Sequence, residues 1–280
     1  MRVRIVTDSA SDLPQEMADA LGIVVVPLHV RFGADELVDR QELSVAEFWH
    51  RCAASSDLPE TSAPSPGAFK SAFEALFADG AEGVVCVTLS SKLSATNEAA
   101  SQAARAMAER PPVIVLDSFS VTMGQGLMAV AAAEAASDGA AIDRVVAVAE
   151  STRERLTVCG VIDTLESLRR GGRIGGAAAA LGTLLSIKPV IEVREGVVEQ
   201  ESRQRTRAKS LSYLAQKVRS AGPLERLAVV NAQAPDFADF LGLVADVPST
   251  QPRLVGEIGP VIGTHAGPGT IGVAWVRERS

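Results

Sequence analysis

The chain has 280 residues, with 27 Lys or Arg and 34 Asp or Glu, which gives a formal net charge of −7. An acidic chain with only 4% aromatic residues lacks the basic face and the stacking rings that are typical of nucleic-acid-binding proteins. Three isolated cysteines exclude a disulfide framework and a cysteine zinc site, and no apolar run is long enough for a membrane span.

The first half of the chain alternates short apolar runs with helical patterns, which predicts a parallel α/β sheet. We expect strands over 3–6, 23–30, 84–89 and 113–116, and helices over 14–21, 44–54, 66–79, 94–109 and 122–137. Asp12 is the expected N-cap of the first helix, and Ser65 precedes a proline at the start of the third.

The second half has a different pattern, typical of a smaller α+β domain. We expect a helix near 141–154, a strand over 156–161 and a glycine-rich loop over 171–176. A hairpin is expected from strands 187–193 and 197–202 around Arg194, Glu195 and Gly196. A helix over 206–220, a strand over 227–230, a helix over 235–244 and strands over 254–258 and 270–276 complete it. The expected domains are therefore 1–155 and 156–280, two lobes with a ligand cleft between them.

Small polar residues gather where the predicted strands end, in segments 7–9, 61–65, 90–96 and 117–120. Ligands of parallel sheets bind beyond the carboxyl ends of the strands. Three of these segments also lead into helix N-termini, which favour an anionic ligand. Each segment alone is explained as a helix cap or a turn, but their shared edge indicates a site.

His265 and two basic groups are further candidates. His265 lies in segment 259–269, which we predict to be a loop because most of its residues are Gly or Pro. Arg173 lies in the sequence GGRIGG, where it is able to meet a phosphate or an acidic partner. Arg205 belongs to a basic cluster over 203–209 at the start of a predicted helix, where a solvated surface is the alternative explanation.

A serine hydrolase must be weighed against a binding protein. Ser94 or Ser118, with His265 and with Asp8 or Asp117, would supply the residue types of a catalytic triad. No GxSxG elbow occurs in the sequence, and neither a phosphate-binding loop nor a carboxylate cluster for Mg²⁺ is present. The residues therefore favour binding over catalysis.

The ordered motifs resemble those of the DegV family of bacterial fatty-acid-binding proteins. The matching pieces are TDSASDLP at 7–14, TSAPSP at 61–66, SSKLSAT at 90–96, DS at 117–118, GGRI at 171–174, IKP at 187–189 and GTHAGPG at 263–269. The resemblance covers about residues 3–278. It implies a two-domain α/β protein that encloses one long-chain fatty acid, such as palmitate, between its lobes.

The resemblance also implies that the protein has no catalysis and no cofactor of its own. It would present the carboxylate to a separate kinase subunit, which makes an acyl-phosphate from ATP. Such a protein is expected in the cytoplasm, with no nucleic-acid partner and no more than transient membrane contact. The second alternative is a subunit of a sugar or triose kinase of the dihydroxyacetone type, whose α/β layout the family is thought to share.

The family's functional residues carry over to named positions. Thr61 and Ser94 would bind the carboxylate through their hydroxyls, and His265 would approach the same group; we call these three the head-group residues. Arg173 and Arg205 would lie on the face that meets the kinase. Supporting residues of the head-group loops would be Ser9, Ser62, Ser91, Ser118 and Thr264. The chain departs from the family's usual residues at Ala63, Ala95, Asn97 and Ala266.

Overall fold

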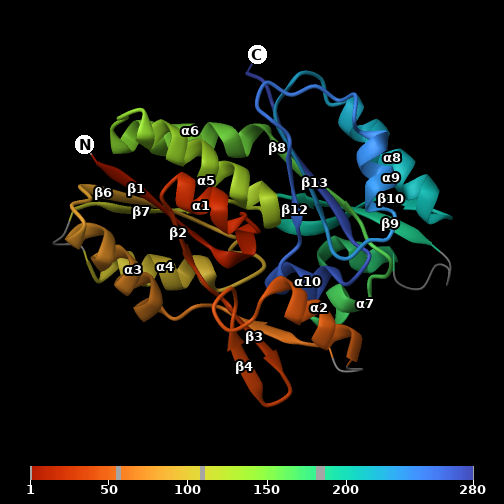
Figure 1. Cartoon of the computed structure of the whole chain (residues 1–280), viewed down its shortest axis with the longest axis horizontal. Coiled ribbons are helices and arrows are strands. Elements are labelled where there is room, and N and C mark those ends of the chain that lie inside the picture. Colours follow the sequence, from red (N-terminus) through yellow and green to blue (C-terminus); the bar gives the residue numbers. More distant parts are fainter. Residues whose placement is uncertain (1, 55–57, 108–110, 181–186, 280) are drawn as a thin grey trace.

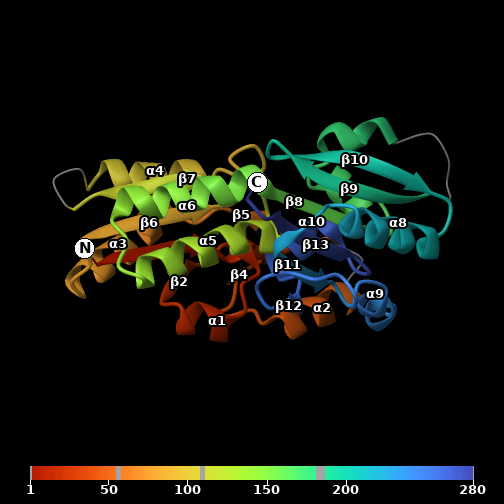
Figure 2. The ribbon, with the colours of Figure 1, turned by 90° about the horizontal axis from the view of Figure 1, so that it is seen from above.

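The computed structural model describes residues 2–54, 58–107, 111–180 and 187–279. The strands of this part of the chain form a four-stranded parallel sheet, a six-stranded mixed sheet and a three-stranded antiparallel sheet. Seen from above, the two larger sheets lie side by side along the long axis of the molecule (Figure 2). The prediction of an α/β protein with a parallel sheet in its first half is confirmed.

The parallel sheet is made from the apolar runs of the first half. Its strands stand in the order β2 (Ile23–Val26), β1 (Val3–Asp8), β6 (Gly83–Thr88) and β7 (Val113–Asp117). Every residue of β6 is buried, as expected for a central strand with helices on both faces. One face is covered by α3 (Pro66–Ala78) and α4 (Thr96–Arg105), and the other by α5 (Thr122–Ser137) and α6 (Ile142–Arg155) (Figure 1). Residues 108–109 of the helix predicted over 94–109 lie outside the described residues.

The six-stranded sheet is built from the second half. Its order is β10 (Val197–Gln204), β9 (Lys188–Arg194), β8 (Leu156–Val161), β13 (Ile271–Arg277), β11 (Leu224–Asn231) and β12 (Leu254–Glu257). The predicted hairpin is confirmed: β9 and β10 are antiparallel, and Glu195 and Gly196 have the positive φ angles of a type I′ turn, 46° and 83°. The helices α8 (Arg207–Arg219) and α9 (Phe237–Leu243) pack on one face of the sheet.

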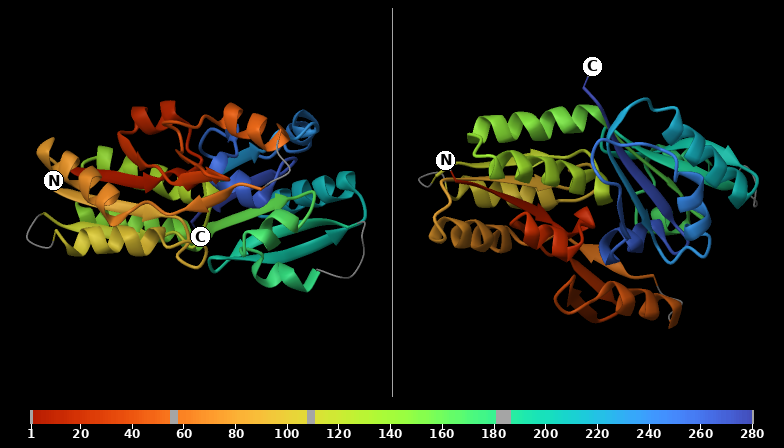
Figure 3. Two further views of the ribbon diagram at one scale, coloured as in Figure 1. Left: turned by 90° about the horizontal axis from the view of Figure 1, so that it is seen from below. Right: turned by 45° about the horizontal axis from the view of Figure 1, so that its top comes forward.

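The third sheet arises where one predicted strand divides. The expected strand over 23–30 is wrong, because Pro27 has no N–H to donate and separates β2 from β3 (His29–Phe32). β3 pairs with β4 (Asp35–Val38) and β5 (Glu60–Ser62), and this small sheet projects below the main body beside α2 (Val45–Ala54) (Figure 3). The pairing carries residues 60–62 towards the second half of the chain.

Two local predictions are wrong. Pro14, and not Asp12, occupies the N-cap position of α1 (Gln15–Ala20). Segment 259–269 is not a loop throughout, since it contains the helix α10 (Pro260–Ala266), which ends at Gly267. Proline at the first helical position and glycine after the last are common helix ends, so this signal was present in the sequence. The remaining short helices are η1 (Ser9–Ser11), α7 (Glu166–Arg170) and η2 (Gly175–Ala180).

The two halves share one apolar core. Helix α5 packs on β1 and β6 of the parallel sheet and also on β11 and β13 of the other. Val85, Met128, Val230 and Ala274 accordingly belong to a single buried cluster. The expected boundary at 155/156 lies where α6 passes directly into β8. This continuous core holds the two sheets in a fixed relation, and both sheets contribute to the pocket described next.

Candidate functional site

The inner pocket is a mostly apolar cavity of about 200 Å³. Its aliphatic lining comes from both halves of the chain: Leu28, Leu89, Leu93, Val121, Leu168, Ile191, Val193, Val198, Val261 and Ile262. Its polar lining residues are Thr61, Ser62, Ser94, Arg173 and His265. An apolar lining with a few polar groups is typical of a site for a small amphipathic ligand.

Thr61 and His265 form the central polar contact of the inner pocket. Thr61 lies on β5, where it faces Val30 of β3, and His265 lies on α10. The Oγ1 atom of Thr61 is 2.8 Å from Nε2 of His265, although 204 residues separate them. The small third sheet therefore places the hydroxyl against the imidazole.

The imidazole of His265 is neutral at pH 7. Burial, together with the positive charge of Arg173, lowers the pKa of His265 to about 4. The buried Nδ1 atom has no hydrogen-bond partner among the described residues. A proton on Nε2 is thus the favourable tautomer, because it leaves no buried N–H unpaired. In that tautomer, Nε2–H donates to Thr61 Oγ1, and the Thr61 hydroxyl hydrogen remains available to a ligand.

Ser94 lies on the same pocket, in the segment that joins β6 to α4. Its Oγ atom is 2.8 Å from Oγ1 of Thr96 and accepts a hydrogen bond from the Thr96 backbone N–H at 3.3 Å. When Thr96 donates through its hydroxyl as well, the Ser94 hydroxyl hydrogen points elsewhere. The structure thus brings all three head-group residues to one pocket, each able to offer or relay a donor to an anion.

Arg173 stands between the inner pocket and a second, polar cavity. This outer pocket shares Thr61, Arg173 and His265 with the inner one, and its further polar residues include Arg31, Glu60, Ser167, Arg170 and Thr264. The guanidinium of Arg173 is half-buried, and its Nε donates to the Leu93 carbonyl at 3.1 Å. Arg205, in contrast, is exposed between β10 and α8 and lines neither pocket.

The predicted supporting residues divide into two groups. Ser62 lines the inner pocket, and Thr264 lines the outer one. Ser9, Ser91 and Ser118 line neither. The Ser118 hydroxyl donates to the Ser120 carbonyl inside its own turn at 3.2 Å, and Ser9 accepts a hydrogen bond from the Leu28 backbone N–H.

Three of the four positions that depart from the family pattern line the inner pocket. Ala63, Ala95 and Ala266 line the inner pocket with methyl groups. Asn97 lies on α4 and donates from Nδ2 to the Thr88 hydroxyl at 2.9 Å, which ties the helix to the end of β6. The small side chains of these three alanines take up little of the pocket's volume, whereas Asn97 does not line the pocket.

The hydrolase arrangement does not form. His265 Nε2 contacts Thr61 and neither Ser94 nor Ser118, and among the described residues Nδ1 receives no carboxylate. Asp8 instead accepts from the Leu89 N–H, and Asp117 from the N–H groups of Ser91 and Phe119. A serine nucleophile with a His–Asp pair is therefore not present at this site.

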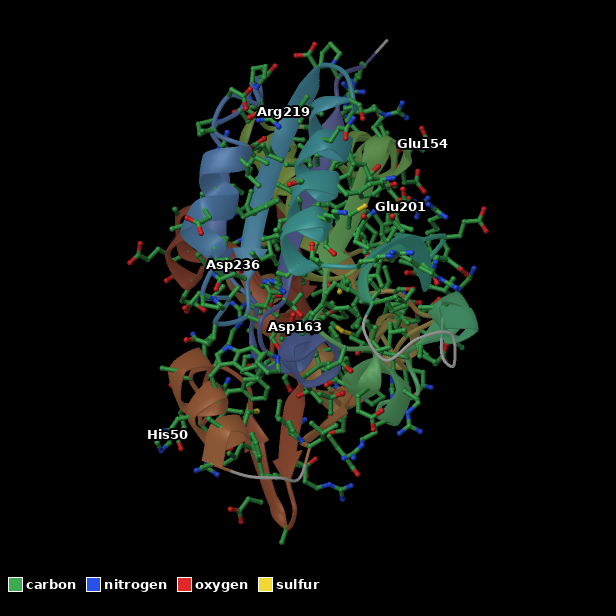
Figure 4. The ribbon with its side chains drawn as sticks, turned by 90° about the vertical axis from the view of Figure 1, so that its right-hand side faces the viewer. His50, Glu154, Asp163, Glu201, Arg219 and Asp236 are labelled. Carbon is green, nitrogen blue, oxygen red and sulfur yellow. The ribbon has the colours of Figure 1, made fainter. Side chains whose placement is uncertain are left out.

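Among the residues that the structure describes, no group of three or more His, Cys, Asp or Glu side chains is placed to hold a metal ion. No helix in the described ranges combines the length and apolar character needed to cross a membrane. Of the other histidines, His29 lies on β3, and His50 is exposed on α2 and points away from the body of the molecule (Figure 4).

The sequence patterns did not predict the apolar walls of the inner pocket. Ile191 and Val193 are two residues apart on β9 and therefore share the face that lines the pocket. This alternation was visible in the sequence, but nothing in it indicated that this face of the hairpin meets the loops of the first half.

Fold and pocket together are typical of an α/β protein that encloses a small amphipathic ligand. A family model described as "Uncharacterised protein, DegV family" matches residues 2–278. A DegV domain-containing protein of Streptomyces coelicolor is 37% identical over 276 residues, which is 97% of each chain. A DegV domain-containing protein of Deinococcus radiodurans is 38% identical over 280 residues, which is 98% of each chain. The chain therefore belongs to the DegV family, as its ordered motifs predicted.

Solved structures of the family match over the whole length. A DegV family protein from Thermus thermophilus, described as fatty acid binding, has a TM-score of 0.91 at 35% identity and covers 99% of this chain and 100% of its own. DegV of Bacillus subtilis, described as a fatty acid binding protein, has a TM-score of 0.86 at 29% identity with the same coverage. The similarity confirms the predicted fold class.

Proposed function

We propose that this protein is a carrier that binds one long-chain fatty acid in the inner pocket and has no catalysis of its own. The acyl chain lies along the aliphatic walls, and the carboxylate meets Thr61, Ser94 and His265. The observation that carries this proposal is the junction of an apolar cavity with a hydrogen-bonded Thr61–His265 pair at its polar end. Relatives described as fatty acid binding share the fold over the full chain.

The energetics agree with an acid of this kind. Each buried methylene contributes about 0.8 kcal/mol, so a chain of about fifteen methylenes gains roughly 12 kcal/mol before the cost of ordering it. A carboxylate is costly to bury unless donors surround it. The hydroxyls of Thr61 and Ser94 supply such donors, and the charge of Arg173 lies beside the polar end. The neutral imidazole of His265 donates Nε2–H to Thr61 Oγ1, and the Thr61 hydroxyl in turn donates to the carboxylate.

The proposal extends to a partner. The outer pocket adjoins the carboxylate end and leads away from the apolar walls, so a second protein is able to reach the head group there. We assign this approach to an ATP-dependent kinase subunit that converts the bound acid to an acyl-phosphate. Arg173 acts at the junction of the two pockets, and exposed Arg205 offers a charge for docking.

Competition between an acid and its ester tests the binding step. Protein stripped of lipid is loaded with a fluorescent fatty acid, and palmitate or methyl palmitate is added as competitor. The ester keeps the chain and loses the anionic oxygen, so we expect it to bind at least about tenfold more weakly. Failure of palmitate to compete, or equal competition by the ester, contradicts the proposal.

A further inference from the structure

The segment Thr7–Asp12 carries a conspicuous polar motif that does not line the inner pocket. Its polar side chains are nevertheless buried: Asp8 is 0% exposed, Ser9 is 1% exposed and Asp12 is 6% exposed. Burying two carboxyl groups and a hydroxyl is unfavourable unless each has partners. The partners of these three side chains show what the motif does.

Each of the three side chains accepts a hydrogen bond from the backbone of a different distant segment. The Oδ2 atom of Asp8 accepts from the Leu89 N–H at 2.8 Å. The Oγ atom of Ser9 accepts from the Leu28 N–H at 3.0 Å. The Oδ1 atom of Asp12 accepts from the Gly259 N–H at 2.9 Å, across 247 residues.

Two of the three bonded segments carry a head-group residue, and the third pairs with the strand that carries the remaining one. Leu89 follows β6 and opens the stretch that ends in Ser94. Leu28 directly precedes β3, whose pairing with β5 places Thr61 opposite Val30. Gly259 is the N-cap residue of α10, the helix that holds His265. One short motif therefore binds the segments of Ser94 and His265 and the strand that positions Thr61.

We propose that Asp8, Ser9 and Asp12 are positioning residues that fix Thr61, Ser94 and His265 relative to one another. The proposal rests on the proposed function for its ligand, but its geometric part concerns the protein alone. The three side chains contact neither the inner pocket nor the outer one. Their effect on a ligand is therefore transmitted through the backbone of the segments that they hold.

Asp12 provides the strongest evidence for this role. Helix α10 has only seven residues, and Asp12 holds its N-cap residue, Gly259, by the backbone N–H of that residue. A Cβ atom at residue 259 would lie 2.8 Å from Asp12 Oδ1, so this approach needs a glycine there. Asp12 itself has a φ of 51°, a left-handed conformation that is uncommon outside glycine. The contact therefore depends on the absence of a Cβ atom at Gly259 and occurs with Asp12 in a left-handed conformation.

The test compares two substitutions of Asp12, each made alone and together with His265→Ala. Asp12→Ala removes the acceptor, whereas Asp12→Asn keeps an Oδ1 oxygen that accepts from Gly259. Palmitate affinity is measured for both, alone and in a His265→Ala background, and thermal unfolding confirms that each variant folds. We expect Asp12→Ala to bind about tenfold more weakly and Asp12→Asn to stay near the parent. In the His265→Ala background the Asp12→Ala effect should largely disappear, because residues that act through one another are not additive.

A second readout needs no ligand. The chain has three histidines, so the imidazole signal of His265 is assigned by comparison with His265→Ala in ¹H–¹⁵N NMR spectra. We expect the signal to move in Asp12→Ala and to stay near the parent position in Asp12→Asn. Equal behaviour of the two Asp12 variants, or additive effects of Asp12 and His265, overturns the positioning role. A parent that binds no palmitate refutes the proposed function instead, and the NMR comparison still decides the positioning role.

Discussion

Gly171 offers a sharp test of the head-group geometry. It ends α7 with a φ of −71°, an ordinary value for any residue, so alanine brings no backbone strain. A Cβ atom there would lie 2.9 Å from Cε1 of His265 and still closer to Nδ1. The ring must move by about 1 Å to restore normal contact at Nδ1, and it lies in a closely packed, largely buried position. A displacement of that size changes the 2.8 Å contact with Thr61 by enough to lose its hydrogen-bond geometry.

We expect Gly171→Ala to weaken palmitate binding by about tenfold, as for the loss of one hydrogen bond that serves a charged group. Gly172→Ala is the matched control. Its added Cβ meets nothing within 4 Å, but its φ of 68° makes alanine costly by about 1 kcal/mol of folding stability. The control should therefore unfold more easily and bind normally. If Gly171→Ala binds palmitate like the parent in the displacement assay, His265 does not serve the carboxylate.

Three other predictions use the same binding and unfolding assays. Thr61→Val and Ser94→Ala should each weaken palmitate binding about 10- to 150-fold. The control Thr152→Val removes a buried hydroxyl within α6 and should leave palmitate affinity unchanged. If all three variants bind palmitate equally well, Thr61 and Ser94 do not bind the carboxylate. Arg205→Ala should keep its bound lipid and lose acyl-phosphate formation with the kinase subunit and ATP, and loss of lipid would exclude a docking role. Burial raises the pKa of Asp12 to about 7, so the folded state binds more protons than the unfolded chain between pH 4 and 7, and the free energy of unfolding should fall as pH rises through that interval. Asp12→Asn should flatten this part of the pH profile, and an unchanged slope would show that Asp12 does not titrate as described.

The elements that the sequence predicted well depend on local signals. The strands of the parallel sheet are mostly short apolar runs, and the central strand β6 is buried on both faces. The turn contains Gly196, a residue that readily accepts a positive φ angle, so the hairpin was also predictable. In both cases the physical cause lies within a few residues.

The errors have both local and tertiary causes. Asp12 has the residue type of an N-cap, but its side chain binds the N-cap residue of α10, 247 residues away, and does not cap the adjacent α1. Segment 259–269 is rich in breakers, and its helix forms with that distant acceptor in place. The break at Pro27 followed a local rule, but the pairing of β3 with β5 that it permits depends on the whole chain.

The candidate site was predictable only in its polar part. Thr61, Ser94 and His265 were predicted from ordered motifs, and the structure places them on one pocket. The aliphatic wall formed by Ile191 and Val193 follows from how the hairpin meets the first half, which no short pattern encodes. Arg173 was expected on an outer face, whereas its side chain is half-buried between the two pockets.

The lipid content of the protein as purified shows whether it binds a fatty acid. The freshly purified chain is denatured in organic solvent, and the extract is analysed by mass spectrometry beside an extract of the Thr61→Val variant. We expect about one long-chain fatty acid per parent molecule and a clear depletion in the variant. An extract free of fatty acid, from a parent that also takes up none when palmitate is supplied, would contradict the proposed binding function.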